Sequence, residues 1–550
     1  MGGGLGRTLR KWFWFGCGAT GIGTLLILLL SSGWLGFRLF QLEWKPQGKT
    51  DLAFREVALD FTNATDISEK TGSLPFMAGV VIDIDQDGRD EIVLGGGRGQ
   101  EDGVFGYAQE ADGFTRLNGN PDLAKAADDA TMGGVSVDLD FDGRPELLLA
   151  RESGLWIYDN DRGRLQAGRL VFSPPADDRT TLLSIAPGDV NGDRLTDLYL
   201  SGYIQNAHVE GQTIFTRPYG GYSYLLIGRT DGSFTDETAS WGLRRQHNTF
   251  TALFADIDSD GGADLIVAQD TGVIETWRND GAAPFVRLEN PSVNSYPMGL
   301  AAADFTGDGT LDVYASNVGH TLPQALLRGD LPGDAPFNPD YMLFAGDGVG
   351  GFSDIARDRG AARIGFGWGV VAADFNLDGW EDIAIAQNYA KFGQHAVIHR
   401  YTGKILQNYG GETFRPVEKR AGAANRLFAI SPLVGDFDGD GRPDLVWANL
   451  NGPSRALLNV TPDVRPITLR LDDSIRAYGA RIEIEAGGRT LVRQVVPAQG
   501  LASDQTASLL IGMGDIAEPV AIRIDWPDGT SDTFDTVEAG NVIDARRNAP

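Results

Sequence analysis

Short apolar runs enclose acidic turns along most of the chain. The runs "AGVVI" and "EIVLGG" enclose the first turn, and "TALFA" and "DLIVAQ" enclose a later one. Apolar runs of about four to eight residues, bounded by Gly and Asp, are typical of β-strands joined by tight loops. The pattern therefore predicts a strand, a loop and a strand at each turn, and an all-β fold.

A second pattern follows most of the acidic turns. The stretches "YLLIGRTDGSFTDETASWGL", "YMLFAGDGVGGFSDIARDRGA" and "LQNYGGETFRPVEKRAGA" each contain an apolar strand, a turn with Gly, and a strand that starts with Phe. Two hairpins per unit make four strands, which is one blade of a β-propeller.

The acidic turn occurs seven times, at offsets of 55, 51, 67, 48, 70 and 62 residues. In chain order the copies are "DIDQDGRDE" from Asp83, "DLDFDGRPE" from Asp138, "DVNGDRLTD" from Asp189, "DIDSDGGAD" from Asp256, "DFTGDGTLD" from Asp304, "DFNLDGWED" from Asp374 and "DFDGDGRPD" from Asp436. Repeats of about 40–50 residues are typical of propellers. We therefore expect a seven-bladed β-propeller over residues 52–460, and we number the copies motif loops one to seven.

The two ends of the repeat region indicate how the ring closes. The seventh copy leads to "RALLNV" with no Phe-starting strand after it, whereas a stretch of that kind, "LDFTNATDISEKTG" at residues 59–72, precedes the first copy. We expect this N-terminal segment to complete the last blade, which would leave no open sheet edge.

The charge of the chain narrows the classes of partner. A net charge of −28 argues against nucleic acid, because phosphate binding needs a basic surface. The single cysteine, Cys17, excludes a disulfide framework and a cysteine metal site, and five histidines leave little room for zinc. Cations are the natural ligands of such a chain.

Oxygen-bearing side chains recur at fixed places in the motif loops. Positions 1, 5 and 9 are carboxylates in every copy, position 3 is Asp, Asn or Thr, and position 6 is Gly except for Arg194. Calcium takes six to eight hard oxygen ligands, and alternate side chains of a tight loop can converge on one ion. The predicted ligands of up to seven structural Ca²⁺ ions are Asp83, Asp85, Asp87, Glu91, Asp138, Asp140, Asp142, Glu146, Asp189, Asn191, Asp193, Asp197, Asp256, Asp258, Asp260, Asp264, Asp304, Thr306, Asp308, Asp312, Asp374, Asn376, Asp378, Asp382, Asp436, Asp438, Asp440 and Asp444.

These positions account for nearly all of the acidity. They hold 25 carboxylates, and the rest of the chain has a net charge of −3. Carboxylates crowded into nine residues repel one another strongly without a cation. The competing interpretation is a plain polar turn, because Asp-Gly alone is a strong hairpin signal. Magnesium fits less well, since it prefers fewer protein ligands and keeps its waters.

The N-terminus predicts a membrane segment. Arg7, Arg10 and Lys11 precede a mostly apolar stretch at 12–37, which is long enough to cross a bilayer with the N-terminus in the cytoplasm. The alternative is a signal peptide cleaved near Ser31-Ser32-Gly33, which would make the protein secreted. Both interpretations place the bulk of the chain outside the cytoplasm, in the periplasm or at the cell surface.

The C-terminal segment predicts a separate small β domain. The stretch "YGARIEIEAGGRTLVRQVV" alternates apolar and polar residues, and turns are expected at Gly487-Gly488 and Asp528-Gly529. The expected organisation is a cytoplasmic N-terminus at 1–11, a transmembrane signal anchor at 12–40, a linker at 41–51, the propeller at 52–460 and the β domain at 461–550.

Three longer units contain inserts, at about 203–222, 317–341 and 388–404. Each follows the strand that leaves a motif loop, so strand geometry places it on the opposite face of the propeller. The inserts hold His208, His320, His395, His399, Tyr203, Phe215, Arg217, Tyr219, Phe337, Phe392 and Tyr401. Aromatic and Arg side chains on loops can form a docking surface, although the inserts could equally pack on one another. The stretch "HAVIH" lacks the Glu of a zinc hydrolase helix.

The motif loops resemble the FG-GAP or VCBS repeats of integrin alpha-chain propellers, in the form D-x-[DN]-x-D-G-x-x-[DE]. The departures are Arg194 and Thr306. The segments "GARI", "AGGR", "LIGMGD" and "IDWPDGT" resemble the ASPIC/UnbV domain. The combination is similar to the cartilage acidic protein family and its bacterial relatives, which implies a secreted or surface-exposed calcium-binding protein.

The leading hypothesis is a membrane-anchored, exported, calcium-binding adhesion module that binds an envelope or extracellular protein or a glycan. One alternative is an accessory extracytoplasmic subunit of a larger membrane complex. Another is a polysaccharide lyase or hydrolase that uses the insert face. Because no acid and base pair stands out in the sequence, we expect no enzymatic activity.

Overall fold

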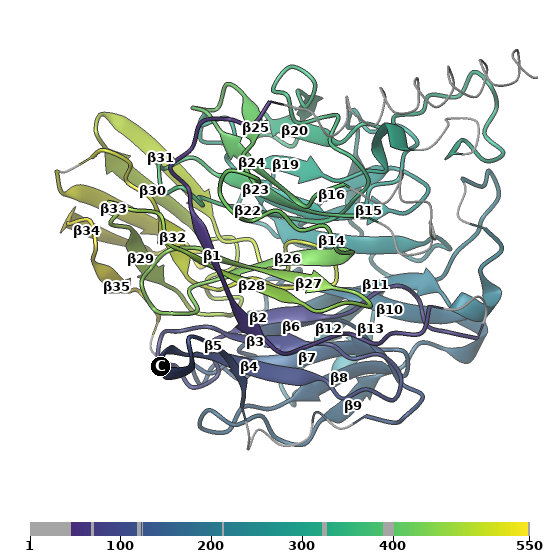
Figure 1. The fold of residues 1–550 in the computed structure, drawn as a ribbon. Helices are drawn as coiled ribbons and strands as arrows, with labels where there is room; N and C mark the ends of the chain where they lie inside the picture. Colours follow the sequence, from purple (N-terminus) through teal and green to yellow (C-terminus); the bar gives the residue numbers. More distant parts are fainter. Residues whose placement is uncertain are drawn as a thin grey trace, which may run out of the picture.

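The computed structural model describes residues 46–67, 71–117, 123, 125–211, 214–321, 327–388, 401–516 and 518–547. Their regular structure consists of β-strands with a few short 3₁₀ turns, which confirms the all-β class (Figure 1). No helix in these ranges is long and apolar enough to cross a membrane. The predicted anchor at 12–40 lies outside the described residues, as do His395 and His399.

Five sheets of the repeat region are four-stranded antiparallel meanders in chain order. They are β6 to β9 (Thr131–Val137, Glu146–Arg151, Gly154–Tyr158, Arg169–Phe172), β10 to β13 (Thr180–Gly188, Asp197–Ile204, Tyr224–Gly228, Phe234–Asp236), β14 to β17 (Thr249–Ala255, Asp264–Gln269, Ile274–Arg278, Val286–Leu288), β18 to β21 (Leu300–Ala303, Asp312–Ala315, Met342–Gly346, Phe352–Asp354) and β22 to β25 (Gly367–Ala373, Asp382–Gln387, Lys404–Asn408, Phe414–Pro416). Each motif loop from two to six joins the first and second strands of one of these sheets, as predicted.

The remaining repeat strands form one eight-stranded sheet in the order β2-β3-β4-β5-β1-β28-β27-β26. Their bounds are Gly79–Ile82 (β2), Glu91–Leu94 (β3), Gly103–Ala108 (β4), Gly113–Arg116 (β5), Phe54–Leu59 (β1), Ala429–Gly435 (β26), Asp444–Asn449 (β27) and Arg455–Asn459 (β28). Motif loops one and seven lie in this sheet, after β2 and after β26.

Strand β1 joins the two ends of the repeat region. It runs antiparallel to β28, with Phe54 opposite Asn459, and parallel to β5, with Ala58 opposite Gly113. The N-terminal segment thus completes the last unit, as the missing strand predicted. The strand itself precedes the expected stretch at 59–72, because Phe54, Val57 and Leu59 supply its buried side.

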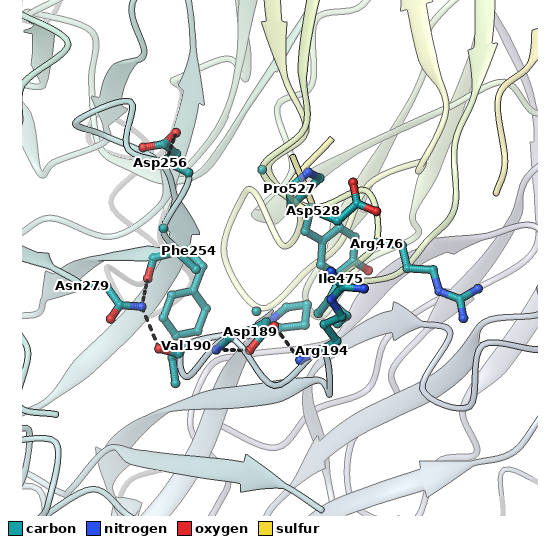
Figure 2. Close-up of a pocket in the computed structure, with 18 of the residues that line it drawn as sticks. Asp189, Val190, Arg194, Phe254, Asp256, Asn279, Ile475, Arg476, Pro527 and Asp528 are labelled. Atoms are coloured by element: carbon teal, nitrogen blue, oxygen red, sulfur yellow. Dashed lines mark hydrogen bonds between the residues drawn. The ribbon is translucent and has the colours of Figure 1, made fainter. Parts of the chain in front are cut away.

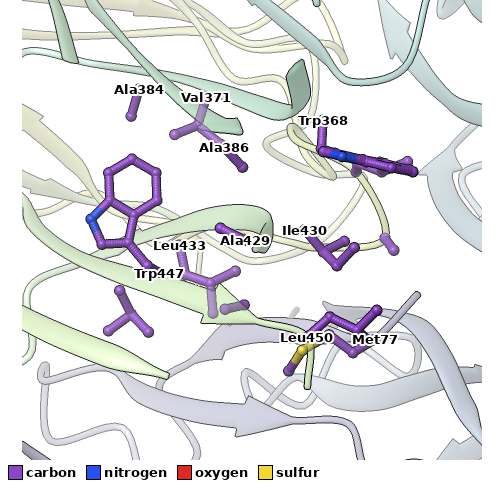
Figure 3. Packing of buried hydrophobic residues seen from close by; sticks show 14 of the residues in the cluster. Met77, Trp368, Val371, Ala384, Ala386, Ala429, Ile430, Leu433, Trp447 and Leu450 are labelled. Carbon is purple, nitrogen blue, oxygen red and sulfur yellow. The ribbon is translucent and has the colours of Figure 1, made fainter. Parts of the chain in front are cut away.

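The first strands of the sheets lie against one another in a closed cycle. Strand β2 contacts β6, and the contacts continue through β10, β14, β18, β22 and β26 back to β2. Apolar side chains fill the space between neighbouring sheets. Between the β22 and β26 sheets, for example, the fully buried Trp447 packs near Val371 and Leu433 (Figure 3).

The C-terminal domain consists of two further sheets with the orders β32-β29-β35 and β31-β30-β33-β34. Their strands are Ile467–Arg470 (β29), Arg481–Ala486 (β30), Arg489–Gln494 (β31), Leu509–Ile511 (β32), Val520–Asp525 (β33), Ser531–Val537 (β34) and Val542–Asp544 (β35). A separate apolar core that includes Ile482, Ile522 and Trp526 lies between them. These sheets lie beside the repeat region, drawn in yellow and green in Figure 1.

The loop between β31 and β32, which we call the axial loop (residues 495–508), enters the cycle of first strands. Its backbone accepts a hydrogen bond from Gly79 of β2 at 3.3 Å, donates to Leu300 of β18 at 2.9 Å, and donates to Val434 of β26 at 3.1 Å. Leu501 and Ala502 are 0% and 1% exposed and belong to the main core of the repeat region. The C-terminal domain therefore shares a core with the propeller-like sheets.

Shortening Leu501 should destabilise the protein as a whole. We expect Leu501→Ala to lower the free energy of unfolding by about 2–5 kcal/mol, because it leaves a cavity among the first strands. Val542→Ala is the matched control, since Val542 is 57% exposed and its change should stay within about 0.5 kcal/mol. Chemical denaturation measures both, and equal effects would contradict a packed axial loop.

Candidate metal centres

The seven motif loops share one hydrogen-bond frame. The N–H of position 6 donates to the Oδ2 of the position 1 Asp in every loop, at 2.8–3.1 Å. The N–H of position 7 donates to the Oδ1 of the position 5 Asp in every loop, at 2.7–3.0 Å. These amides orient both carboxylates and fold the loop around them.

The frame depends on a left-handed backbone at two places. Positions 4 and 6 have φ between +58° and +89° in all seven loops. Glycine adopts this region without strain, which explains Gly at position 6 in six copies. Arg194 adopts it with φ +65° in loop three. It still donates its N–H to Asp189, so the loop keeps its shape.

Position 9 is the first residue of the second strand in every unit, from Glu91 in β3 to Asp444 in β27. In six loops its carboxylate accepts the N–H of position 2, at 2.7–3.1 Å. Burial raises the pKa of Glu91 and Glu146 to about 8 and that of Asp197 to about 7, and other carboxylates of the same loop add to the effect. Each loop therefore holds an acidic group that burial and nearby like charge keep from ionising readily.

Four loops bring three carboxylate oxygens within 4.8 Å of one another. The groups are Asp83, Asp85 and Glu91; Asp138, Asp140 and Glu146; Asp256, Asp258 and Asp260; and Asp436, Asp438 and Asp444. The first, second and last use positions 1, 3 and 9, whereas loop four uses positions 1, 3 and 5.

Arginine at position 7 explains this difference. Asp87 pairs with Arg89 at 2.5 Å, and Asp142 pairs with Arg144 at 3.1 Å. Asp440 of loop seven pairs with its position 7 arginine in the same way. Loop four has Gly at position 7, so its position 5 carboxylate has no such partner and joins the cluster.

Loops three, five and six keep the hydrogen-bond frame without such a cluster among the described residues. Their predicted ligands are Asp189, Asn191, Asp193 and Asp197; Asp304, Thr306, Asp308 and Asp312; and Asp374, Asn376, Asp378 and Asp382. Position 3 is a neutral oxygen donor in each of them. In loops three and six the amide of this Asn donates to the position 5 carboxylate, at 3.0 Å and 2.8 Å.

Six oxygen atoms at predicted ligand positions are buried without a hydrogen-bond partner among the described residues. They are Asp83 Oδ1, Asp258 Oδ1, Thr306 Oγ1, Asn376 Oδ1, Asp382 Oδ2 and Asp438 Oδ1. A buried oxygen without a partner is unfavourable, and a bound ion is one of its ordinary explanations. Carboxylate, amide and hydroxyl oxygens are also the ligands that calcium takes. The residues present therefore fit a calcium ion.

Four asparagines that sequence reasoning missed tie neighbouring sheets together at these loops. Asn160, Asn279, Asn408 and Asn459 each donate Nδ2 to the position 2 carbonyl of the preceding motif loop, at 2.8–3.0 Å. Each also donates to the position 8 carbonyl of its own loop, at 3.2 Å. The sequence signal that could have identified these four residues is an Asn at or just after the end of the third strand of the unit.

The C-terminal domain covers part of the motif-loop face. Arg481 donates to the carbonyl of Gly309 in loop five, and Arg489 donates to that of Asp378 in loop six, both at 2.8 Å. Arg493 forms a buried ion pair with Glu381, next to the position 9 residue of loop six. Arginines of the C-terminal domain thus meet the acidic loops directly.

The described parts of the first two inserts contact each other, which is the alternative to an aromatic docking surface. Tyr203, Tyr219 and Tyr401 are at most 9% exposed. The carbonyl of Ile214 in the first insert accepts the N–H of Asp330 in the second, at 3.1 Å. Most of the aromatic rings expected to meet a partner therefore belong to the main core or pack against it.

Models of known families match three parts of the chain. The model described as ASPIC and UnbV matches residues 473–549. FG-GAP-like repeats match residues 138–200 and 256–315, and an FG-GAP repeat matches 428–458. The matched repeats include motif loops two to five and seven.

Relatives resemble the chain over much of its length. It is 22% identical over 506 residues to cartilage acidic protein 1 of Xenopus tropicalis, covering 82% of this chain and 70% of that protein. It is 24% identical over 314 residues to cartilage acidic protein 1 of Mus musculus, covering 53% of this chain and 44% of that protein.

Solved structures of low similarity include a lectin of Agrocybe aegerita, with a TM-score of 0.34 and 15% identity over 73% of this chain and 95% of that one. They also include the Pan2 WD40 domain of Neurospora crassa, with a TM-score of 0.39 and 8% identity over 71% of this chain and 89% of that one.

Replacing one inter-sheet asparagine should weaken the packing of two units. Asn459 is 1% exposed, and Asn459→Asp removes both of its amide donors. We expect the free energy of unfolding to fall by about 1–3 kcal/mol, because two buried carbonyls lose a partner. The matched control is Asn541→Asp on the surface, which should change stability by less than about 0.5 kcal/mol. Equal effects of the two substitutions in denaturant titrations would contradict a role for Asn459 in joining the two sheets.

The metal-free protein should lose stability as the pH rises. The folded-state pKa values of Asp83, Glu91 and Glu146 are raised to about 6, 8 and 8, above the ordinary range that the unfolded chain has. Between the two values the folded state holds protons that the unfolded state has released, so stability falls as pH rises through about 6 to 8. Melting temperatures of metal-stripped protein at several pH values measure this. A rise over that window would contradict it.

Proposed function

Because this chain carries FG-GAP repeats followed by an ASPIC and UnbV domain, we propose that it is a calcium-stabilised β-propeller that serves as a binding module outside the cytoplasm. Neither of these is a typical catalytic family. The proposed partner is an envelope or extracellular protein or a glycan.

The proposed propeller has seven blades. The closed cycle of contacts among first strands supports this number, with β2 and β26 as neighbours. The eight-stranded sheet then contains the first and last blades, and β1 is the outer strand of the last one. Seven units in a closed ring bury their sheet faces against one another, which a single unit cannot do.

Calcium is the proposed stabilising ion. The single observation that carries this proposal is that six of the nineteen buried, unpartnered polar atoms among the described residues are oxygens at positions that the sequence predicts as ligands. Loops one, two, four and seven would hold the ion most strongly, since each gathers three carboxylates. A bound ion would neutralise these carboxylates and join the first and second strands of a blade.

The proposed location rests on the N-terminal sequence. The apolar stretch after Arg7, Arg10 and Lys11 would anchor the protein by one helix at 12–40 and leave the rest outside the cytoplasm. If the protein is instead an accessory subunit of a membrane complex, the same N-terminal helix would anchor it there.

An enzyme that works in the axial channel is not part of the proposal. The axial loop enters the channel from the C-terminal domain, and aromatic rings meet inside it. Phe76 lies 5.4 Å from Phe250 and 5.8 Å from Trp368, measured between ring centroids. Phe76, Phe250 and Trp368 are at most 5% exposed, so these rings offer a polysaccharide almost no open surface.

Calcium should raise the melting temperature of the metal-stripped protein. At 100 times the dissociation constant, each site contributes about 2.7 kcal/mol to the folded state. Asp438→Asn should reduce this gain and remove up to one bound calcium, because Asp438 belongs to the cluster of loop seven. The exposed Asp60 provides the control Asp60→Asn, which should leave both unchanged. An unchanged melting temperature, together with no bound calcium by elemental analysis, would contradict the proposal.

A further inference from the structure

Motif loop six is the most deeply covered of the seven loops. None of its residues 374–382 is exposed, whereas each of the other six loops has two or three exposed residues. The difference is clearest at position 5, whose carboxylate is exposed in the six other loops and half-buried in loop six, at Asp378. Loops three and four, by contrast, line an open cleft of about 630 Å³ beside the C-terminal domain (Figure 2).

Strand β31 of the C-terminal domain supplies part of the cover over loop six. Arg489 donates to the carbonyl of Asp378 at 2.8 Å, and its Cζ lies 5.3 Å from the ring centroid of Trp380. Arg493 forms an ion pair with Glu381, in which the two side chains are 8% and 9% exposed. Two charged side chains of one strand thus hold the domain on this loop.

The turn after β32 supplies the rest of the cover and reaches a predicted metal ligand. The N–H of Gly512 donates to Oδ2 of Asp374, the position 1 carboxylate, at 3.1 Å. The N–H of Gly514 donates to the carbonyl of Leu377 at 2.9 Å. A Cβ added at Gly512 would lie 2.1 Å from the backbone carbon of Leu377 and 2.3 Å from Asp374 Oδ2. The domain and the loop are therefore too close for a side chain to enter between them.

Two oxygen atoms of this covered loop lack a hydrogen-bond partner among the described residues. They are Asn376 Oδ1 and Asp382 Oδ2, at positions 3 and 9. Asp382 differs from the other position 9 residues, because Phe375 donates its N–H to the carbonyl of Ala373 instead. The Oδ1 of Asp382 accepts the N–H of Asn408 at 2.7 Å, so Oδ2 is the oxygen left for an ion. Amide and carboxylate oxygens are both calcium ligands.

The charges of the covered loop also favour a divalent cation. Loop six holds four acidic side chains, and β31 brings the two arginines described above to it. The acidic residues are Asp374, Asp378, Glu381 and Asp382. Four negative and two positive charges leave a difference of −2, which one calcium ion balances. Buried charge without a counter-ion is unfavourable, so the cover and the ion stabilise each other.

We propose that the C-terminal domain is a lid that encloses one calcium ion in loop six, so that this ion leaves only when the domain lifts from the loop. The inference deepens the calcium scaffold proposed above and rests on it. Ions in the six other loops lie beside exposed residues and exchange without such a movement. Lifting the domain breaks several buried contacts at once, so the open state is rare and release from loop six is slow.

The test measures how fast calcium leaves the full chain in detergent. Calcium-loaded protein is mixed with an excess of a fluorescent chelator, and the released calcium is counted per chain over time. We expect two phases, in which one ion per chain leaves at least about tenfold more slowly than the others, because its exit waits for the lid.

Two ligand variants identify the slow ion. Asp382→Asn should remove the slow phase and one bound calcium, because Asp382 supplies the free carboxylate oxygen of loop six. Asp438→Asn is the matched variant in loop seven, where the position 5 residue Asp440 is exposed. It should reduce the fast phase and keep the slow one.

Two lid variants leave every predicted ligand in place. Arg489→Ala removes the hydrogen bond to Asp378 and should speed the slow phase about fivefold or more. Gly512→Ala should speed it likewise, since the added Cβ meets the backbone of the loop. Arg523→Ala is the matched control, because Arg523 lies on β33 of the same domain, pairs with Asp525 and has a side chain that is 56% exposed. It should leave both phases unchanged.

Three results would overturn the inference. They are release of all bound calcium in one phase, a slow ion that persists in Asp382→Asn, or an unchanged slow phase in both lid variants. The count of bound calcium separates the two proposals. If calcium binds and leaves in one phase, the lid fails while the calcium scaffold stands, and if no calcium binds, both fail.

Discussion

The buried carboxylate that begins the second strand of each unit is the constraint on which the rest of the structure depends. Asp444 illustrates it, since this side chain is 0% exposed and accepts N–H groups from Phe437 at 3.1 Å and from Asn459 at 2.7 Å. One acidic group therefore joins the loop, the second strand and the end of the third strand. Such burial is unfavourable for the charged form unless donors or a cation surround it. The acidic residues of the loop, its shape and its fit to a cation follow from this one requirement.

The same point in the fold links neighbouring units. The side chain of Asn459 makes this link, because its Nδ2 donates a hydrogen bond to the carbonyl of Phe375 in the preceding loop. The motif loops are thus junctions between sheets as well as turns within them. Where one unit would leave its faces exposed, the closed cycle of first strands buries them, and β1 links the first and last units. The axial loop then adds hydrogen bonds from the C-terminal domain to strands that are far apart in the sequence.

Local periodic features could be predicted from the sequence. The seven loops, the strand start at position 9 and the closing role of the N-terminal segment depend on neighbouring residues, so each copy carries its own signal. The bounds of β1 were less certain, because "FREVAL" and the following stretch both alternate. Contacts that depend on the assembled ring had no such signal. Leu501 gives no hint that it lies inside another domain, and Asn160 resembles any polar residue at a strand end. Tyr203 looks like a surface aromatic in an insert, yet it stacks on Phe250.

Other parts of the chain cover both faces of the ring of sheets in part. On the insert face, aromatic rings are buried against the core, and on the motif-loop face Arg481, Arg489 and Arg493 hold the C-terminal domain against loops five and six. Loops three and four lie across a cleft from the same domain. In loop three Arg194 stands where the other motif loops have Gly, and its backbone N–H still donates to Asp189. The repeated loops thus supply the scaffold that holds the C-terminal domain in place.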